Sequence, residues 1–342
     1  MRARSFALFV APSLVMMALF VAAPLVVVVV QSFYRTETVF RDVTIENCTP
    51  GFLAPTCVTE TRRIPELGPD GRPVTRTVAV GFEAYRQLLQ PARVAAAFAP
   101  GGGGLAAVLA IDFWRALRFT LTFTLATLPL VLGLGLALAL AVDGLARSLR
   151  GPVIFATLLP FVVTPVVGAL SIRWLFLGDG IMTRLLEWLL ARDIAMFAQA
   201  WTIELLMLFY RVWHVVPFAF VVFYAGLQTV DRDTLESAIV DGASRAERLV
   251  HVVVPHLAPL IVFVALIHLM DSYRVFDEVV GFASQAHVIS LQWLTFSLLT
   301  PDETGNRALT RASASAVLTM AGIVVLLIAP LRRTWRDHRR RS

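Results

Sequence analysis

The sequence predicts an all-α, polytopic integral membrane protein with six transmembrane helices. Of its 342 residues, 57% are hydrophobic and only 16% are charged, whereas soluble domains are about 25% charged. A spanning helix needs about 20 mostly apolar residues, and six stretches reach that length. They are residues 5–30, 117–142, 153–177, 203–227, 257–280 and 312–331. This pattern excludes a water-soluble enzyme, a disordered chain and a disulfide-rich secreted module.

The positions of the arginines orient the six helices. Thirteen arginines lie before the first stretch, between the second and third, between the fourth and fifth, and after the sixth, whereas the short loops opposite hold four. This excess predicts that both termini are cytoplasmic. The first apolar stretch exceeds the 7–15 residues of a signal peptide's apolar region, which predicts an uncleaved span. The chain then divides into the first span (1–31), a long outer loop (32–112), a transmembrane core (113–331) and a basic tail (332–342).

The basic residues also exclude several functions. All 30 are arginine, and a Walker A phosphate loop or a Schiff-base site needs lysine. The sequence holds no HExxH, GxSxG or CxxC motif either, so we expect no catalytic residue, metal site or cofactor in this chain. The net charge of +6 comes with six arginines in the tail, directly after an apolar run. That position is typical of a cytoplasmic anchor, so we expect no nucleic-acid partner.

The long outer loop contains both cysteines, Cys48 and Cys57. Pro50, Gly51 and Pro55 lie between them and favour a turn. Because the loop faces the oxidising side of the membrane, a disulfide is expected, and closing this short loop stabilises the fold by about 2–3 kcal/mol in the chain-entropy model. Two free thiols are the alternative.

The cytoplasmic loop 230–255 is predicted to form two short helices joined at Gly242. Glycine ends a helix readily because it adopts the left-handed conformation without steric cost. Ser244 and Glu247 have the spacing of a capping box at the start of the second helix. Further local signals are Asp233 as N-cap of the first helix, Glu236 three residues on, and Pro255 as a break before the fifth span.

Two roles fit this helix–glycine–helix segment. It could rest on lipid headgroups, as amphipathic interfacial helices do. Helices of that kind are usually rich in basic residues, however, whereas this segment mixes acidic residues with three arginines. The mixture favours a protein partner.

The segment Glu236-Ser-Ala-Ile-Val-Asp241-Gly242-Ala243, followed by Val254-Pro255 and Pro259, resembles the EAA loop of bacterial binding-protein-dependent ABC importer permeases. The carbohydrate-uptake, maltose-type branch of that family is similar from the first span to the sixth, except in the long outer loop. Two departures are Ser237, where alanine is usual, and Leu249, where phenylalanine is usual. The other stretches that carry the resemblance are Ser32-Phe33, residues 113–124, Leu159-Pro160, Pro217-Phe218, residues 225–228 and residues 274–277.

The resemblance implies a type I importer permease in the bacterial inner membrane that works only as part of a complex. Its partners would be an ABC ATPase dimer that binds ATP and Mg, a second and different permease subunit, and a substrate-binding protein that delivers a carbohydrate. Membrane lipid would surround the spans. The residues expected to couple to the ATPase are Glu236, Ala238, Asp241, Gly242 and Ala243.

A polar stripe in the fifth span indicates a second site. Charges inside a span are costly and usually functional, and on a helix His268, Asp271, Ser272, Val275 and Glu278 fall within about 120°. Arg274 is placed to pair with Asp271 or Glu278. By position in the resembled family, the expected substrate-binding residues are Arg211, His214, Phe218, His268, Asp271, Ser272 and Val275.

Several alternatives stay open at this stage. The polar stripe could instead be an ion-paired seam against the partner permease. An ion-coupled secondary carrier is the alternative function, although such carriers often show internal repeats and none is visible here. The resemblance leaves open whether the carbohydrate is a mono-, di- or oligosaccharide, a polyol or a sugar acid, and Arg211 with the two histidines leaves room for an anionic sugar.

Overall fold

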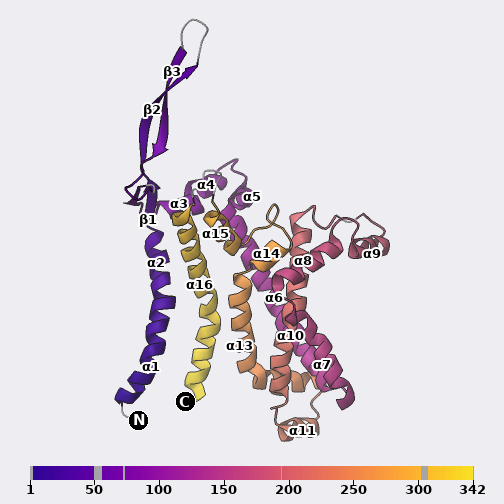
Figure 1. Ribbon diagram of the computed structural model, residues 1–342. Helices are drawn as coiled ribbons and strands as arrows, with labels where there is room; N and C mark the ends of the chain where they lie inside the picture. Colours follow the sequence, from indigo (N-terminus) through magenta and orange to yellow (C-terminus); the bar gives the residue numbers. More distant parts are fainter. Residues whose placement is uncertain (1–2, 50–55, 72–73, 194, 302–306, 342) are drawn as a thin grey trace. The chain divides into compact units, whose positions relative to one another are not determined.

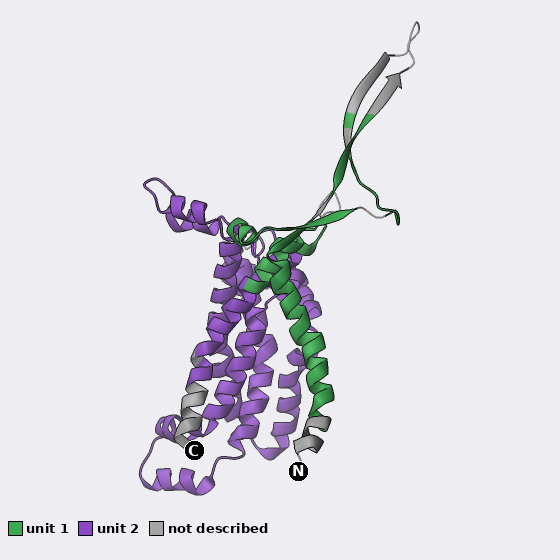
Figure 2. Ribbon diagram, turned by 90° about the vertical axis from the view of Figure 1, so that its left-hand side faces the viewer, with its two compact units in different colours: residues 1–88, 298–317 green, residues 89–297, 318–342 purple. Residues whose placement is uncertain are grey.

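The computed structural model describes residues 3–49, 56–71, 74–193, 195–301 and 307–341. It is mostly helical, which confirms the predicted fold class, and it adds two pairs of antiparallel strands in the long outer loop that the apolar pattern did not predict. The chain divides into two compact units, shown in Figure 2: unit 1 is Met1–Leu88 with Leu298–Val317, and unit 2 is Leu89–Ser297 with Leu318–Ser342.

Unit 1 begins with a continuous helical stretch and continues into two β-ribbons. Inside it, the Ser32 hydroxyl and the Tyr85 hydroxyl are 2.7 Å apart, and the Thr310 hydroxyl donates to the Tyr34 carbonyl at 2.9 Å. These contacts tie the end of the first helix to the loop and to the start of the last helix. Its elements are α1 (Ala3–Met17), η1 (Ala18–Ala22), α2 (Ala23–Gln31), β1 (Tyr34–Thr38), β2 (Phe40–Thr49), β3 (Thr56–Pro65), β4 (Thr75–Ala79) and α3 (Glu83–Leu89).

The register of β2 and β3 places Cys48 directly opposite Cys57. Directly opposed residues of an antiparallel pair have Cα atoms about 4.5–5.5 Å apart, and disulfides need about 4.4–6.8 Å. The backbone is therefore compatible with the predicted bridge, which stays a prediction. The turn expected around residues 50–55 lies outside the described residues.

Unit 2 holds most of the helices. In the described residues of both units, five helices are long and apolar enough to cross a membrane: Phe9–Gln31, Asp112–Asp143, Ala200–Leu227, Arg245–Tyr273 and Leu309–Arg332. Figure 1 shows α6 and α10 side by side, with α11 at one end of α10 and α9 at the other. The elements after α3 are α4 (Pro91–Ala97), α5 (Gly104–Leu109), α6 (Asp112–Asp143), α7 (Arg147–Val162), α8 (Pro165–Phe176), α9 (Ile181–Leu190), α10 (Ala200–Leu227), α11 (Arg232–Val240), α12 (Arg245–Arg248), η2 (Leu249–Val253), α13 (Val254–Tyr273), α14 (Asp277–Gly281), α15 (Leu291–Leu299) and α16 (Leu309–Arg341).

The third predicted span, 153–177, is not a straight helix. It consists of α7 and α8, which meet at an angle of 94°. Val163 and Thr164 are extended at the break, with ψ of 133° and 139°. The cause is Pro165, because a residue that precedes proline is pushed out of the helical region. A sixth crossing therefore depends on this bent pair acting as one span.

Close packing of α6 on α10 depends on a glycine. A Cβ added at Gly135 would lie 2.6 Å from the Ala219 Cβ and 3.2 Å from the Phe220 backbone nitrogen. Small residues allow such backbone approach between membrane helices, where van der Waals packing drives association. Gly133, two residues earlier on the same helix, is exposed, and a Cβ there would meet nothing within 4 Å.

We expect Gly135→Val to lower the free energy of unfolding of the purified protein by about 1–3 kcal/mol, because overpacking separates the two helices. Gly133→Val is the matched control, with the same substitution on a face that has room for it. Thermal unfolding in detergent compares the two variants. Equal melting temperatures for both variants would contradict the packing described above.

Candidate functional site

The loop between α10 and α13 folds as two helices joined by a fixed corner. Gly242 has φ +80°, and the backbone nitrogens of Gly242 and Ala243 donate to the carbonyls of Ile239 and Ala238 at 3.0 and 2.9 Å. This pair of hydrogen bonds is the Schellman arrangement, which needs a left-handed residue at the position of Gly242. The prediction that Gly242 ends the first helix is confirmed.

A capping box fixes the other side of the corner. The Ser244 backbone nitrogen donates to Glu247 Oε2 at 2.7 Å, and the Glu247 nitrogen donates to Ser244 Oγ at 3.3 Å. Both bonds confirm the predicted box, which satisfies two of the free N–H groups at a helix start. The corner is therefore bonded on both sides by partners three to five positions apart.

Two local predictions for this loop are wrong. The N-cap of α11 is Asp231 and not Asp233: the Asp231 carboxylate accepts from the Asp233 nitrogen at 3.1 Å and from the Thr234 hydroxyl at 3.0 Å. Pro255 does not break the helix either. The π-helical stretch η2 lets the Val254 nitrogen reach the Leu249 carbonyl, and this wider turn carries the helix past a residue that has no N–H to donate.

The expected coupling residues lie at the surface of this loop. Glu236, Asp241 and Gly242 are exposed, and Ala238 and Ala243 are half-buried. Val240, at the end of α11, is 87% exposed. The loop thus presents two carboxylates and an uncovered apolar residue, and its helix α11 lies at one end of α10 in Figure 1.

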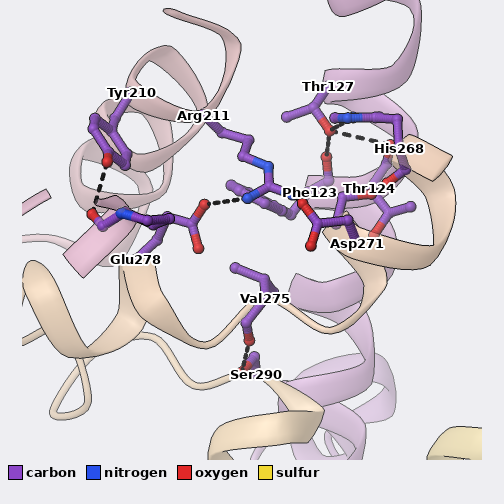
Figure 3. A network of polar contacts seen from close by, with 12 residues as sticks. Phe123, Thr124, Thr127, Tyr210, Arg211, His268, Asp271, Val275, Glu278 and Ser290 are labelled. Atoms are coloured by element: carbon purple, nitrogen blue, oxygen red, sulfur yellow. Dashed lines mark hydrogen bonds and ion pairs between the residues drawn. The ribbon is translucent and has the colours of Figure 1, made fainter. Parts of the chain in front are cut away.

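The second site centres on Arg211, near the middle of α10. Its Nη1 donates to Glu278 Oε1 at 2.8 Å, and its Nη2 pairs with Asp271. The side chains of Arg211 and Glu278 are 6% and 2% exposed, whereas that of Asp271 is 60% exposed. Figure 3 shows the arginine between the two carboxylates. A buried charge is tolerated only when it is paired in this way.

The geometry of the fifth span differs from its prediction. Helix α13 ends at Tyr273 rather than at residue 280, and Glu278 belongs to the separate helix α14. The prediction that Val275 and Glu278 share one helical face with His268 and Asp271 is therefore wrong. Arg274 is exposed, and the cation that pairs with the carboxylates of Asp271 and Glu278 is Arg211. Val275 lies in the hydrophobic core, with its carbonyl accepting from the Ser290 hydroxyl at 2.6 Å.

The two histidines belong to the helices that carry this ion-paired cluster, His214 to α10 and His268 to α13. His268 Nε2 is 2.9 Å from Thr127 Oγ1, and Ser272 donates to the His268 carbonyl at 2.6 Å. His214 is buried, and neither ring nitrogen has a hydrogen-bond partner among the described residues. Its ring lies edge-on to Tyr210 and Phe161.

The structure thus brings together Arg211, His268, Asp271 and Ser272 of the seven predicted substrate-binding residues. Phe218 stacks on Phe161, with ring centroids 6.0 Å apart, and Val275 is a core residue. Sequence reasoning missed Thr124 and Thr127 of α6, which lie beside His268 in Figure 3. Their signal was present: Thr120, Thr124 and Thr127 recur at spacings of four and three, as residues on one helical face do.

The fold is that of a polytopic α-helical membrane protein with an exposed helix–glycine–helix loop and a buried polar cluster. Residues 102–341 match the family model of binding-protein-dependent transport system inner membrane components, and the chain belongs to that family. It is an ABC importer permease of the type I fold. No finding supports a secondary carrier.

The chain is also similar to individual transport proteins and to a solved structure. The chain is 28% identical to the sn-glycerol-3-phosphate permease protein UgpA of Escherichia coli O6:K15:H31 over 236 residues, 64% of this chain and 73% of UgpA. It is 34% identical to the trehalose permease protein SugA of Mycobacterium tuberculosis H37Rv over 178 residues, 49% of this chain and 53% of SugA. A bacterial alginate ABC transporter, solved with an alginate-pentasaccharide-bound periplasmic protein, matches with a TM-score of 0.57 and 19% identity over 75% of this chain and 86% of that chain.

Proposed function

We propose that this permease moves a carbohydrate across the bacterial inner membrane and receives its energy through the α11–Gly242–α12 loop. The observation that carries the proposal is the loop itself: a corner held by a Schellman motif and a capping box, with exposed carboxylates and an uncovered apolar residue. A transmitting segment must resist bending, and this one is hydrogen-bonded on both sides of its glycine. Glu236 and Asp241 would meet basic groups on an ATPase subunit.

The energy source would be an ABC ATPase dimer, with ATP and Mg bound entirely on those subunits. A second, different permease would complete the membrane pathway, and a periplasmic binding protein would deliver the substrate. In this arrangement both termini and the loop 230–255 are cytoplasmic, residues 32–112 are periplasmic, residues 113–331 form the permease core and residues 332–342 form a basic cytoplasmic tail.

For the substrate, the proposal uses the cluster around Arg211. Asp271 is 60% exposed although it lies at the end of an apolar helix, and a carboxylate there must face water, substrate or protein rather than lipid. Arg211, His214, His268, Asp271 and Ser272 would line the pathway, with Phe218 offering an aromatic face to a sugar ring. Val275 is buried in the hydrophobic core, so it would have a packing role and would not contact the substrate.

Purification tests this assembly directly. An affinity-tagged chain extracted from its native membrane in mild detergent should carry with it an ATPase that has a Walker A loop and one different permease. The variant with Glu236→Arg and Asp241→Arg should retain the permease and lose the ATPase, because only the exposed carboxylates change. A chain that purifies without an ATPase and supports ion-driven uptake in proteoliposomes would overturn the proposal.

A further inference from the structure

The cluster around Arg211 has an excess of negative charge. One guanidinium serves two carboxylates, those of Asp271 and Glu278, and Asp277 adds a third carboxylate next to Glu278 in the chain. Arg274 is exposed and is not part of the pairing. The three paired groups, one guanidinium and two carboxylates, sum to one net negative charge.

The arginine is also not free to receive an anion. Both terminal nitrogens of Arg211 are used by carboxylates, and the side chain is 6% exposed. A phosphate or carboxylate ligand would have to displace Asp271 and would still face Glu278. At about 5 Å and an effective dielectric constant of 20, one uncompensated unit charge corresponds to roughly two orders of magnitude in affinity.

The neighbouring polar groups have hydrogen-bonding capacity left over. On Arg211, Thr124 and the two histidines, five buried atoms have no hydrogen-bond partner among the described residues: Thr124 Oγ1, His214 Nδ1, His214 Nε2, His268 Nδ1 and Arg211 Nε. Buried polar atoms are nearly always satisfied by protein, water or ligand. A hydroxyl can both donate and accept, so a polyhydroxy compound can satisfy hydroxyl and imidazole groups together and can donate to the exposed Asp271.

We infer that this site takes an uncharged polyhydroxy compound and discriminates against its phosphorylated or carboxylated counterparts. The inference rests on the proposed function, because it assumes that the substrate passes the Arg211 cluster. It separates this chain from its relative named for sn-glycerol 3-phosphate, and it closes the possibility of an anionic sugar that the sequence left open.

The test uses matched pairs of probes on the purified complex in nanodiscs, without the binding protein. The pairs are trehalose and trehalose 6-phosphate, glycerol and sn-glycerol 3-phosphate, and glucose and glucuronate. Saturation-transfer NMR titrations give the dissociation constants in the millimolar range. We expect the uncharged member of a pair to bind at least tenfold more tightly than its anionic counterpart.

Two variants assign the preference to this cluster. Asp271→Asn removes the excess charge at an exposed position and should reduce the discrimination at least tenfold. Glu204→Gln removes one carboxylate elsewhere on the same helix as Arg211, where it pairs with Arg118, and should leave the discrimination unchanged.

Each outcome decides the inference. An anionic member that binds as tightly as the neutral one overturns it and leaves the permease assignment standing. Discrimination that Asp271→Asn does not alter overturns the role of this cluster. If no probe binds, the substrate site lies elsewhere and the inference fails, while purification with the ATPase still decides the proposed function separately.

Discussion

Replacing Gly242 by aspartate is expected to abolish ATP-driven uptake while the complex still assembles. At φ +80° any side chain is strained by roughly 1–3 kcal/mol, so the angle between α11 and α12 relaxes. A Cβ at Gly242 meets nothing within 4 Å in this chain, so the fold itself has room for the change. The added carboxylate projects into the surface that would contact the ATPase, and uptake should fall more than tenfold while basal ATP hydrolysis persists.

The chain supplies a matched control for this experiment. Gly178, in the loop between α8 and α9, also has a positive φ, of +54°, and a Cβ there also meets nothing within 4 Å. Gly178→Asp therefore introduces the same residue and a similar strain at the opposite end of α10. It should leave the coupling of hydrolysis to uptake unchanged. Uptake and ATP hydrolysis are measured together in proteoliposomes, and normal uptake by Gly242→Asp would refute the coupling role of the loop.

The second large effect is expected at Arg211. Arg211→Met removes the only cation from Glu278 and Asp271 in the described cluster, and an unpaired buried charge costs about 3–5 kcal/mol. Most of this cost comes from the Glu278 carboxylate, because its side chain is 2% exposed, whereas water can solvate Asp271. The yield of assembled complex and its melting temperature should both fall sharply.

A double variant distinguishes the loss of an ion pair from a simple packing defect. Arg211→Met combined with Glu278→Met replaces both buried partners by apolar groups, a change that is often close to neutral. The double variant should therefore recover most of the stability lost by Arg211→Met. If single and double variants melt at the same lowered temperature, the pair does not account for the stability of this region. Thermal unfolding of the detergent-solubilised complex provides the comparison.

The loop at residues 230–255 shows what local sequence rules can predict. The corner at Gly242 and the Ser244–Glu247 box depend on residues three to five positions apart, so their hydrogen bonds follow from local geometry. The same rules placed the N-cap of α11 at Asp233 instead of Asp231, because two aspartates two residues apart both have the right chemistry. Only the path of the chain leaving α10 selects between them.

The Arg211 cluster shows where local rules stop. Arg274 is three residues from Asp271 and four from Glu278, and helical spacing predicts that it pairs with one of them. The observed partners of Arg211 lie 60 and 67 residues away, and spacing along the chain carries no information about them. The end of α13 at Tyr273 was missed for a related reason. Four of the six residues 275–280 are apolar, which favoured a longer span. The carbonyl of Val275 instead accepts from the hydroxyl of Ser290, a loop residue that folding brings alongside.

The sequence by itself determined the apolar helices, the family, the glycine corner and its capping box, because each depends on composition or on neighbours within one or two turns. The 94° bend between α7 and α8 is local, because Pro165 forces the residue before it out of the helical region. The tertiary structure decided two things: the end of α13, and which carboxylates Arg211 neutralises. The physical reason is that a buried charge binds whichever opposite charges packing brings within reach. Packing between helices far apart in the chain therefore set the charge of the Arg211 cluster.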